Sequence, residues 1–261
     1  MQIVVCVKQV PNTMEVKIDP ETNTLIRQGV PSIVNPFDKN AVEAALRLRE
    51  QHGGKVTALS MGPPQAEEAL RECIAMGADE AILVSDRAFA GADTLATSYT
   101  LAAAIRKMGQ FDLIICGKQA IDGDTAQVGP EIAECLDIPQ ATYVSRIEVA
   151  GKSARIEREH EEGIEVIETS LPLLISVVKS INEPRLPTVK GTMKAARKAI
   201  PVWTAADLAV DPKRLGLKGS PTQVVRIFTP KQRTQGEIIY KDTARAAVLE
   251  LLSKLSDAKL V

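Results

Sequence analysis

The residues whose types and spacing could do chemistry lie in the stretch FDLIICGKQAIDGDTAQVGPEIAECLDIP, which begins at Phe111. Its apolar start predicts a strand over 111–116, and a helix is expected to begin near Val128. Gly117 and Gly123, in the loop between them, can take backbone angles that other residues avoid. The free N–H groups and the positive dipole end at a helix start favour an anion. A strand, a polar loop and a helix start together predict a cradle for a phosphate or a nucleotide.

A simpler interpretation of this loop stays open. Asp122, Asp124 and Thr125 are residue types that also cap helices, so the loop could be an ordinary strand-to-helix turn. The loop contains neither GxGxxG nor GxxxxGK[ST], the patterns of two well-known phosphate-binding loops. In favour of the cradle, open parallel sheets bind their ligands outside the carboxyl ends of the strands, where this loop would lie.

The composition argues against several other functions. The 261 residues are 45% hydrophobic and 25% charged, an ordinary globular balance with room for one large domain and an appendage, or for two small domains. The net charge of −1 and an aromatic content of 3% disfavour a nucleic-acid partner and an anionic membrane surface. With only two histidines, no histidine-rich metal site is expected.

Cysteine usage and hydropathy predict where the protein resides. The four cysteines lie scattered in apolar runs without a CxxC pair, which is typical of buried, reduced thiols in an intracellular protein. No run of 18 apolar residues occurs, so no membrane insertion is expected. The start MQIVVCVKQV is typical of a strand and lacks the features of a signal peptide. We therefore expect a soluble, cytoplasmic protein.

Strand and helix patterns alternate along the first half of the chain. Asp93 is expected to cap one of the helices, and Val16–Ile26 to form a short hairpin. The alternation predicts βαβ units, a parallel sheet and right-handed crossovers. The expected strands cover residues 2–10, 55–61, 81–84 and 111–116, and the expected helices cover about 38–51, 65–77 and 94–108.

After Pro139 the pattern changes to strands joined by short turns, which predicts a strand meander. The many charges between Glu157 and Glu168 are typical of a solvated strand face. Residues 190–198 (KGTMKAARK) form a basic segment, which is either solvent-facing or a docking loop. The meander strands are expected at 141–149, 153–160, 164–169 and 173–178.

The part of the chain beyond Pro201 contains few apolar residues. A short strand is expected at Val224–Phe228, and a last helix at Thr243–Leu255. Because these residues are too few to form a core, we expect an extended C-terminal arm that packs on another surface.

Six stretches, in order, carry a resemblance to a known family: VCVKQVPNT, NPFDKNAVEAALRLRE, ALSMGPPQAEEALRECIAMGADEAILVSD, DLIICGKQAIDGDTAQVGPEIAECL, EVIETSLPLLISV and NEPRLPTVKGTMKAARKAI. Over nearly its whole length the chain resembles the β subunit of an electron-transfer flavoprotein. One departure is Glu162, where the family's surface turn has Gly or Asp. The resemblance implies a flavodoxin-like or Rossmann-like parallel sheet with helices on both faces, plus the strand meander and the extended C-terminal arm.

The resemblance also implies a heterodimer and a division of the chain. Residues 1–182 would form the α/β domain that binds adenine nucleotide or FAD. Residues 183–200 would form a recognition loop that docks on an acyl-CoA dehydrogenase-type flavoenzyme. Residues 201–261 would pack on the α subunit, which carries a second FAD.

The identity of the nucleotide in the cradle depends on the subgroup. Ordinary members of the family hold a structural AMP there. An electron-bifurcating subgroup instead holds FAD, which accepts hydride from NADH and passes one electron to the α-subunit FAD and one to ferredoxin or flavodoxin. Gly123 and Ala126 leave room for a pyrophosphate, and FAGADTLATS resembles the bifurcating version, so we favour FAD over AMP. The flavin would carry the redox chemistry, so no catalytic acid, base or nucleophile is expected.

A third interpretation is a stand-alone ATP-binding α/β protein. The missing P-loop lysine and the coreless arm disfavour it. Stable folding without a partner chain would favour it.

The cofactor-binding residues are carried over from the resemblance position by position. Asn35, Asp38, Thr94 and Thr97 could instead act as helix caps. Asp124 would meet a phosphate through its backbone N–H, because its charge is unfavourable. The expected set is Val7, Lys8, Gln9, Asn35, Asp38, Ser60, Met61, Gly62, Asp93, Thr94, Thr97, Gln119, Asp122, Gly123, Asp124, Thr125, Ala126, Gln127, Val128 and Gly129.

The resemblance also assigns the residues that would dock on the partner enzyme. Val189, or alternatively Leu186, would be the apolar anchor. Lys190, Lys194 and Arg197 would flank the anchor and attract an acidic partner. A solvated loop with incidental charges is the simpler alternative.

Overall fold

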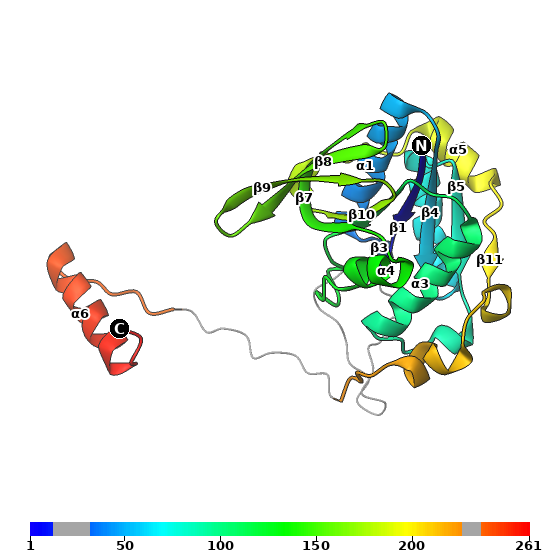
Figure 1. The fold of residues 1–261 in the computed structure, drawn as a ribbon. Coiled ribbons are helices and arrows are strands. Elements are labelled where there is room, and N and C mark those ends of the chain that lie inside the picture. The colour runs from blue at the N-terminus through cyan, green and yellow to red at the C-terminus, as the bar shows by residue number, and fades with distance from the viewer. Residues whose placement is uncertain (13–31, 226–235) are drawn as a thin grey trace. The chain divides into compact units, whose positions relative to one another are not determined.

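The structure is a computed structural model that describes residues 1–12, 32–225 and 236–261. The chain divides into two compact units, Met1–Val225 and Arg226–Val261. The first unit is built on a nine-stranded sheet with the order β11-β5-β4-β1-β6-β10-β7-β8-β9 (Figure 1). The predicted hairpin over Val16–Ile26 lies outside the described residues, and so does most of the predicted strand at Val224–Phe228.

The parallel part of the sheet winds in two directions from its first strand. The chain passes outward from β1 to β4 and β5, and then returns to place β6 on the other side of β1. The winding therefore changes direction between β1 and β6, the point at which open parallel sheets bind ligands. These strands are β1 (Gln2–Cys6), β4 (Lys55–Met61), β5 (Glu80–Val84), β6 (Leu113–Gly117), β10 (Leu173–Val177) and β11 (Val202–Trp203).

Helices cover both faces of the sheet, as expected for this fold class. Along β1, Ile3 and Val5 pack into the core beneath α1 and α2, while Val4 and Cys6 pack into the core beneath α3 and α4. This alternation follows from the two-residue period of a strand. Each fully buried Leu or Ile contributes about 1.5–3 kcal/mol to folding. The helices are α1 (Pro36–His52), α2 (Glu67–Met76), α3 (Thr94–Met108) and α4 (Val128–Leu136).

The antiparallel meander consists of β7 (Gln140–Ala150), β8 (Ser153–His160) and β9 (Gly163–Ser170). The expected fourth meander strand behaves differently. Strand β10 lies between β6 and β7 and runs parallel to both. All five residues of β10 are buried, as in a strand that is covered on both faces.

The predicted first strand is interrupted after Cys6. Residues Gln9–Pro11 (β2) leave the main sheet and pair antiparallel with Ser32–Val34 (β3). The connection after β10 contains a helix, α5 (Val189–Arg197), that packs on α2. Short 3-10 helices complete the first unit: η1 (Pro64–Ala66), η2 (Arg87–Phe89), η3 (Lys179–Ile181), η4 (Ala205–Asp207), η5 (Pro212–Arg214) and η6 (Gly216–Gly219).

Residues 201–220 pack against the same sheet. Strand β11 extends the sheet beside β5, and Leu208 and Leu215 are buried in the core beneath α3. The second unit contains helix α6 (Ala244–Asp257), capped by Thr243 close to its predicted start, and α6 has no buried residue. Within the described parts of the chain, no helix is long and apolar enough to cross a membrane.

Candidate nucleotide-binding site

The loop after β6 is joined to the end of β1 at the point where the winding reverses. The Nζ of Lys8, just beyond β1, lies 2.6 Å from Oδ1 of Asp122 in the loop. Both residues were predicted to belong to the site, and the structure brings them together. The ion pair also means that Lys8 already neutralises one of the two loop carboxylates.

Asn35 connects this loop to the start of α1. Its side chain is fully buried, and its Nδ2 donates to Asp38 Oδ1 (2.9 Å) and to the Gln119 carbonyl (2.8 Å). The backbone N–H of Ile121 donates to Asn35 Oδ1 over 3.1 Å. Asn35 occupies the N-cap position of α1 but makes no capping hydrogen bond with its side chain. The side chain therefore supports the cradle loop, and the alternative in which it caps the helix is wrong.

Asp38 links the ends of β1 and β6. The backbone N–H of Lys8 donates to Asp38 Oδ2 over 2.7 Å, and a side chain on Gly117 would overlap the carboxylate. Burial raises the pKa of Asp38 to about 7, although hydrogen bonds from Asn35, Lys8 and Gly117 act in the opposite direction. This carboxyl group therefore changes its charge near neutral pH at the base of the cradle.

The cradle loop, residues 118–127 between β6 and α4, contains two non-glycine residues with positive φ. Asp124 and Ala126 have φ values of 49° and 55°, in the left-handed region that non-glycine residues rarely adopt. Gly123, which was expected to use this freedom, is not among the positive-φ residues, and open space surrounds the position of its absent side chain. Gln119 Nε2 donates to Asp124 Oδ1 over 2.7 Å and so holds the bend. Strain of this kind costs about 1–3 kcal/mol per residue and concentrates at functional sites.

The start of α3 lies beside the start of α4 and was predicted to contact the cofactor. Thr94 Oγ1 donates to Glu131 Oε1 of α4 over 3.0 Å, and Ser98 Oγ donates to Glu131 Oε2 over 2.8 Å. Asp93 caps α3 by accepting from the N–H of Ala96 at 3.0 Å, as predicted. Two helix starts, each with free N–H groups, therefore flank the end of the cradle loop (Figure 1).

Ser60, at the end of β4, is a buried polar residue without a hydrogen-bond partner. Its side chain is 1% exposed, and its Oγ has no partner within the described residues. Buried polar atoms nearly always have a partner, so this hydroxyl is available to a ligand. The neighbouring Met61 and Gly62 are only partly buried.

The remaining predicted residues occupy several environments. Val7 is buried in the core beneath α1 and α2. Gln9 Nε2 donates to the Gln65 carbonyl over 3.1 Å. Thr125 and Gln127 are exposed, and Gly129 is buried at the start of α4.

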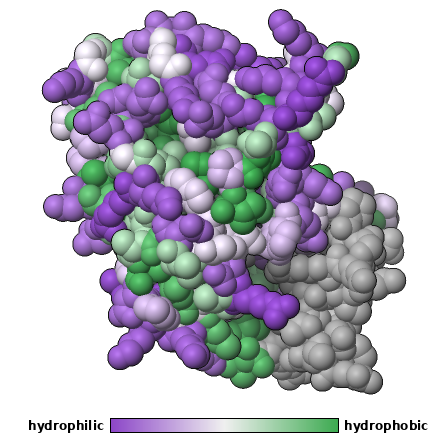
Figure 2. All heavy atoms as spheres, turned by 90° about the vertical axis from the view of Figure 1, so that its right-hand side faces the viewer, coloured by the Kyte–Doolittle hydropathy of each residue, from purple (hydrophilic) through white to green (hydrophobic). Residues whose placement is uncertain are grey.

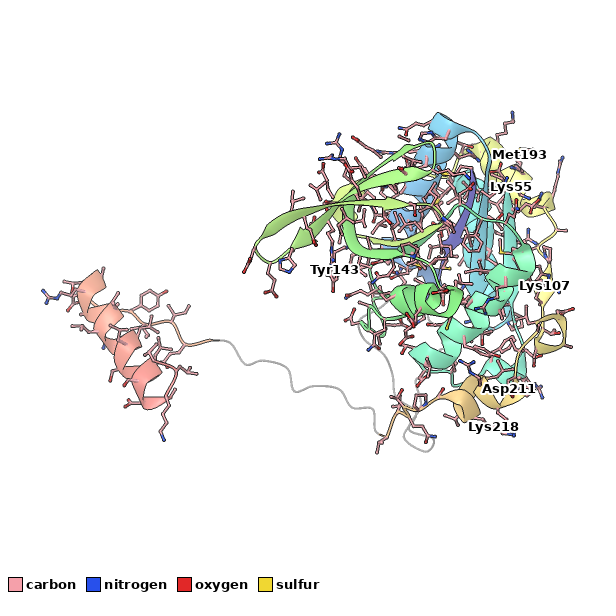
Figure 3. The ribbon with its side chains drawn as sticks, in the orientation of Figure 1. Lys55, Lys107, Tyr143, Met193, Asp211 and Lys218 are labelled. Carbon is pink, nitrogen blue, oxygen red and sulfur yellow. The ribbon has the colours of Figure 1, made fainter. Side chains whose placement is uncertain are left out.

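Two residues near the cradle were not predicted. Lys118 Nζ lies 4.9 Å from the ring centroid of Tyr143, a distance typical of a cation–π contact. Tyr143, labelled in Figure 3, has a φ of 58°, beside an irregularity in the pairing of β7 with β10. The position of Lys118 in the polar loop, two residues after the predicted strand over 111–116, was a usable signal. A left-handed tyrosine has no sequence signal, because this conformation is expected of glycine.

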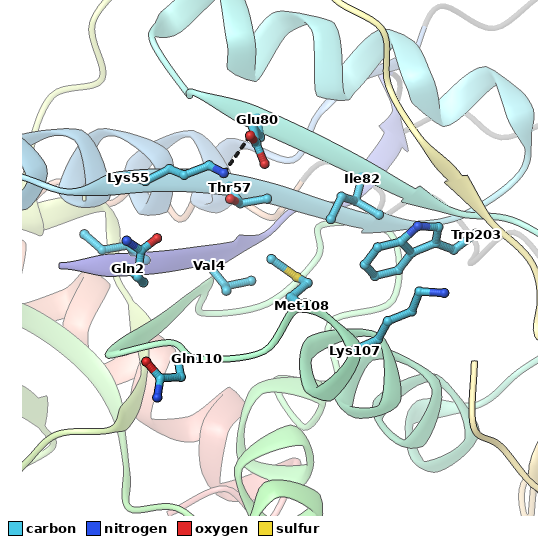
Figure 4. A pocket seen from close by; sticks show the side chains of 11 residues that line it. Gln2, Val4, Lys55, Thr57, Glu80, Ile82, Lys107, Met108, Gln110 and Trp203 are labelled. Carbon is cyan, nitrogen blue, oxygen red and sulfur yellow. Dashed lines mark ion pairs between the residues drawn. The ribbon is translucent and has the colours of Figure 1, made fainter. Parts of the chain in front are cut away.

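A separate cavity of about 280 Å³ lies near the opposite, amino-terminal ends of β1 and β4 (Figure 4). In its lining, Lys55 pairs with Glu80 over 2.6 Å, and Lys107 Nζ lies 4.9 Å from the Trp203 ring centroid. These charged groups are already satisfied, and neither helix start points here. We therefore assign the candidate site from the converging loops and not from this cavity. The described residues contain no group of three or more side chains suited to hold a metal ion.

The predicted docking residues lie on and before α5. Leu186, Val189 and Met193 are 84%, 81% and 55% exposed. The face of the molecule on the α5 and β11 side shows hydrophobic patches between hydrophilic residues (Figure 2). Among the basic residues, Lys190, Lys194 and Arg197 are all exposed.

Arginines and a close helix contact hold both ends of this segment. The Arg185 guanidinium binds Glu43 Oε2 through Nε (2.7 Å) and Glu50 Oε1 through Nη1 (2.6 Å). At the other end, Arg71 donates to the carbonyl of Ala195 at the end of α5. A side chain at Gly191 would overlap the backbone of α2, so α5 approaches α2 as closely as glycine allows.

The sheet order defines a doubly wound α/β protein, and the loop at the reversal point is its candidate ligand site. The family model described as electron transfer flavoprotein domain matches residues 22–208. The chain is 55% identical to the electron transfer flavoprotein subunit beta of Thermoanaerobacterium thermosaccharolyticum, over 100% of both chains. It is 54% identical to the subunit of the same name from Megasphaera elsdenii, again over 100% of both. It is 52% identical to the caffeyl-CoA reductase-Etf complex subunit CarD of Acetobacterium woodii, over 100% of both. The chain therefore belongs to the electron transfer flavoprotein β-subunit family.

Proposed function

We propose that this chain binds FAD in the cradle after β6 and works, together with an α subunit, as an electron-bifurcating flavoprotein. The bound FAD would supply the redox chemistry by accepting hydride from NADH and passing single electrons to the α-subunit FAD and to ferredoxin or flavodoxin. The residues of this chain would bind and orient the cofactor.

The observation that carries the proposal is the contact between the end of the cradle loop and the start of α3. The loop carries polar residues from Asp122 to Gln127, and the hydroxyl of Thr94, the first residue of α3, lies 3.4 Å from Gln127 Oε1. A mononucleotide needs one phosphate site, whereas two helix starts, those of α3 and α4, are linked here through Thr94 and Glu131. Two adjacent anion-favouring helix starts favour a dinucleotide.

The electrostatics of the cradle support binding through N–H groups and a nearby cation. Lys8 neutralises Asp122, and Gln119 binds Asp124, so neither carboxylate is left without a partner. Within the described residues Lys118 forms no ion pair, so its charge is available to phosphate oxygens. The buried hydroxyl of Ser60 and the open space at Gly123 would accommodate other parts of the ligand.

The partners of the proposed complex follow from exposed apolar residues. Helix α6 exposes Val248, Leu249, Leu251 and Leu252 by 46–58%. Such a surface favours a permanent partner, which we take to be the α subunit. Residues 183–200, called the docking segment below, are held at both ends by arginine side chains and expose Val189. This segment would bind an acyl-CoA dehydrogenase-type enzyme, consistent with the reductase complex named for CarD of A. woodii.

The alternative function is an ordinary β subunit that holds structural AMP. Its support is the acidity of the cradle, because Asp122 and Asp124 disfavour the second phosphate of FAD. A stand-alone ATP-binding protein is less consistent with the exposed apolar residues of α6.

The test is the nucleotide content of the complex. The chain is co-expressed with its α subunit, the purified heterodimer is denatured, and the released nucleotides are separated by chromatography. Two FAD and no AMP per heterodimer are expected. One FAD with one AMP would establish the alternative, and a β subunit without nucleotide would overturn the cradle assignment.

A further inference from the structure

The segment that leads out of the first unit is attached to the cap of α3. The backbone N–H and the Oγ1 of Thr222 both donate to Asp93 Oδ2, over 3.0 and 2.9 Å. The other oxygen of Asp93 accepts from the N–H of Ala96 and caps the helix. One carboxylate therefore accepts hydrogen bonds both from a helix start and from a loop residue 129 positions further along the chain.

Further hydrogen bonds beside Asp93 support this attachment. Asp93 N–H donates to Ser220 Oγ over 2.8 Å, and Ser220 Oγ donates to the Gly216 carbonyl over 2.8 Å. The Leu217 N–H donates to the Ala90 carbonyl over 3.0 Å. A side chain on Gly216, where φ is 51°, would overlap the backbone carbonyls of Ala88 and Ala90.

The charge state of Asp93 suits it for this role. Burial acts to raise the pKa of Asp93, but hydrogen bonds from Ala96 and Thr222 outweigh it, so the pKa lies below its usual range. The carboxyl group is therefore ionised at neutral pH and accepts from both sides. Hydrogen bonds to an ionised acceptor are roughly twice as strong as neutral ones.

The same helix start is also tied to the cradle. Thr94, the first residue of α3, binds Glu131 of α4, and α4 begins where the cradle loop ends. In the other direction along the chain, the second compact unit begins at Arg226, shortly after Thr222. Asp93 thus lies between the proposed cofactor site and residues 216–225, which lead into the second unit and are called the root of the C-terminal arm below.

We propose that the hydrogen-bonded pair of Asp93 and Thr222, called the joint below, couples cofactor occupancy of the cradle to the order of residues 216–225 at the root of the C-terminal arm. Both are positioning residues: Asp93 has its acceptors occupied within the chain and acts on the cofactor through the α3 helix start. By linkage, a joint that the bound cofactor stabilises also tightens cofactor binding, and differences in affinity appear mainly in the rate of release. This inference rests on the proposed function only in requiring that a nucleotide occupies the cradle.

The experiment measures nucleotide release from the heterodimer purified with its α subunit. Thr222→Val removes the hydroxyl that binds Asp93, and Thr222→Ser restores it. The matched control is Thr204→Val, because Thr204 makes the same kind of pair with Asp207 on the same segment. Lys107 near the end of α3 donates to the Asp207 carbonyl, so this control pair lies at the opposite end of the helix.

The expected result is nucleotide release about fivefold faster in Thr222→Val, with rates near wild type in Thr222→Ser and Thr204→Val. Removal of the nucleotide from the wild-type complex should also raise hydrogen exchange in residues 216–225, and this response should be lost in Thr222→Val. Equal release rates in the two valine variants, or no exchange response in the wild type, would overturn the joint.

A wild-type complex that contains no nucleotide would overturn both the proposed function and the joint. A complex that retains its nucleotide equally well in every variant would overturn the joint alone. Thermal unfolding of each variant identifies a general loss of stability, which Thr204→Val would share.

Discussion

The cradle and the docking segment depart from ordinary burial in opposite ways. In the cradle, Asn35 and Asp38 are polar side chains that are almost fully buried. In the docking segment, Leu186 and Val189 are apolar side chains that are more than 80% exposed. A buried polar group and an exposed apolar patch are the two observations that most often indicate function.

The two regions also differ in what supports them. The cradle depends on side chains that bind its backbone from within, with Asn35 as the central group. The docking segment depends on Arg185 and Arg71, which hold its ends, and on the close approach of Gly191 to α2, while its large apolar side chains stay exposed. The difference teaches that a ligand pocket is organised around internal hydrogen bonds, whereas a docking surface needs an ordered backbone with free side chains. Order before binding reduces the entropy lost on docking.

The largest effect that would separate the two regions is expected from Asn35→Ala. The substitution leaves the Ile121 N–H and the Gln119 carbonyl without their buried partner and removes one of the hydrogen bonds to the Asp38 carboxyl, which costs about 4 kcal/mol of unfolding free energy. Nucleotide content of the heterodimer should fall with it. The matched control is Asn40→Ala, since Asn40 is also buried but donates to the Asn182 carbonyl before the docking segment. Loss of nucleotide in both variants would contradict the separation.

Arg185→Met is the corresponding test of the docking segment. It removes a cation from Glu43, which is 3% exposed on its side chain and would keep only Arg47 as a partner. Breaking one side of a buried ion pair costs about 3 kcal/mol. Urea unfolding measures this loss, and hydrogen exchange in residues 186–197 should rise while nucleotide content stays unchanged. Arg185→Lys should be intermediate, because an ammonium group cannot bridge Glu43 and Glu50 bidentately.

The pH dependence of stability tests the base of the cradle. Because the pKa of Asp38 is raised from 3.8 to about 7, its contribution to stability is fully present below pH 3.8 and is lost as pH rises through 7. The slope is at most about 1.4 kcal/mol per pH unit within this window. The unfolding free energies of wild type and Asp38→Asn are measured between about pH 5 and about pH 7, and their slopes against pH should differ by one proton. Parallel curves would show that Asp38 ionises normally.

The smallest effect on stability is expected from Leu186→Ser combined with Val189→Ser. Both side chains are exposed, so unfolding free energy should change by less than about 0.5 kcal/mol. Electron transfer to the dehydrogenase-type partner should nevertheless slow, with the nucleotide content preserved. Val224→Ser is the matched control, because Val224 is 78% exposed elsewhere on the chain. Equal slowing by the control would show that exposure alone explains the effect.

Much of the local structure was predictable from the chain. The helix over Thr94–Met108 and the strand over Lys55–Met61 have the predicted bounds. Their periodic apolar residues and the cap at Asp93 are local signals. Helix α5 was not predicted, because Ala195 is its only buried residue and its stability comes from contact with α2.

What the sequence by itself determined is the alternation of strands and helices, the polar loop after β6 and the membership of a family. The tertiary structure alone decided how these parts meet. It placed β10 between β6 and β7, gave Asn35 a partner 84 residues away in Gln119, and attached Thr222 to Asp93. Local patterns record which residues are buried and which can cap a helix. They do not record which distant backbone group a buried side chain will bind, because that depends on which strands lie next to each other in the sheet.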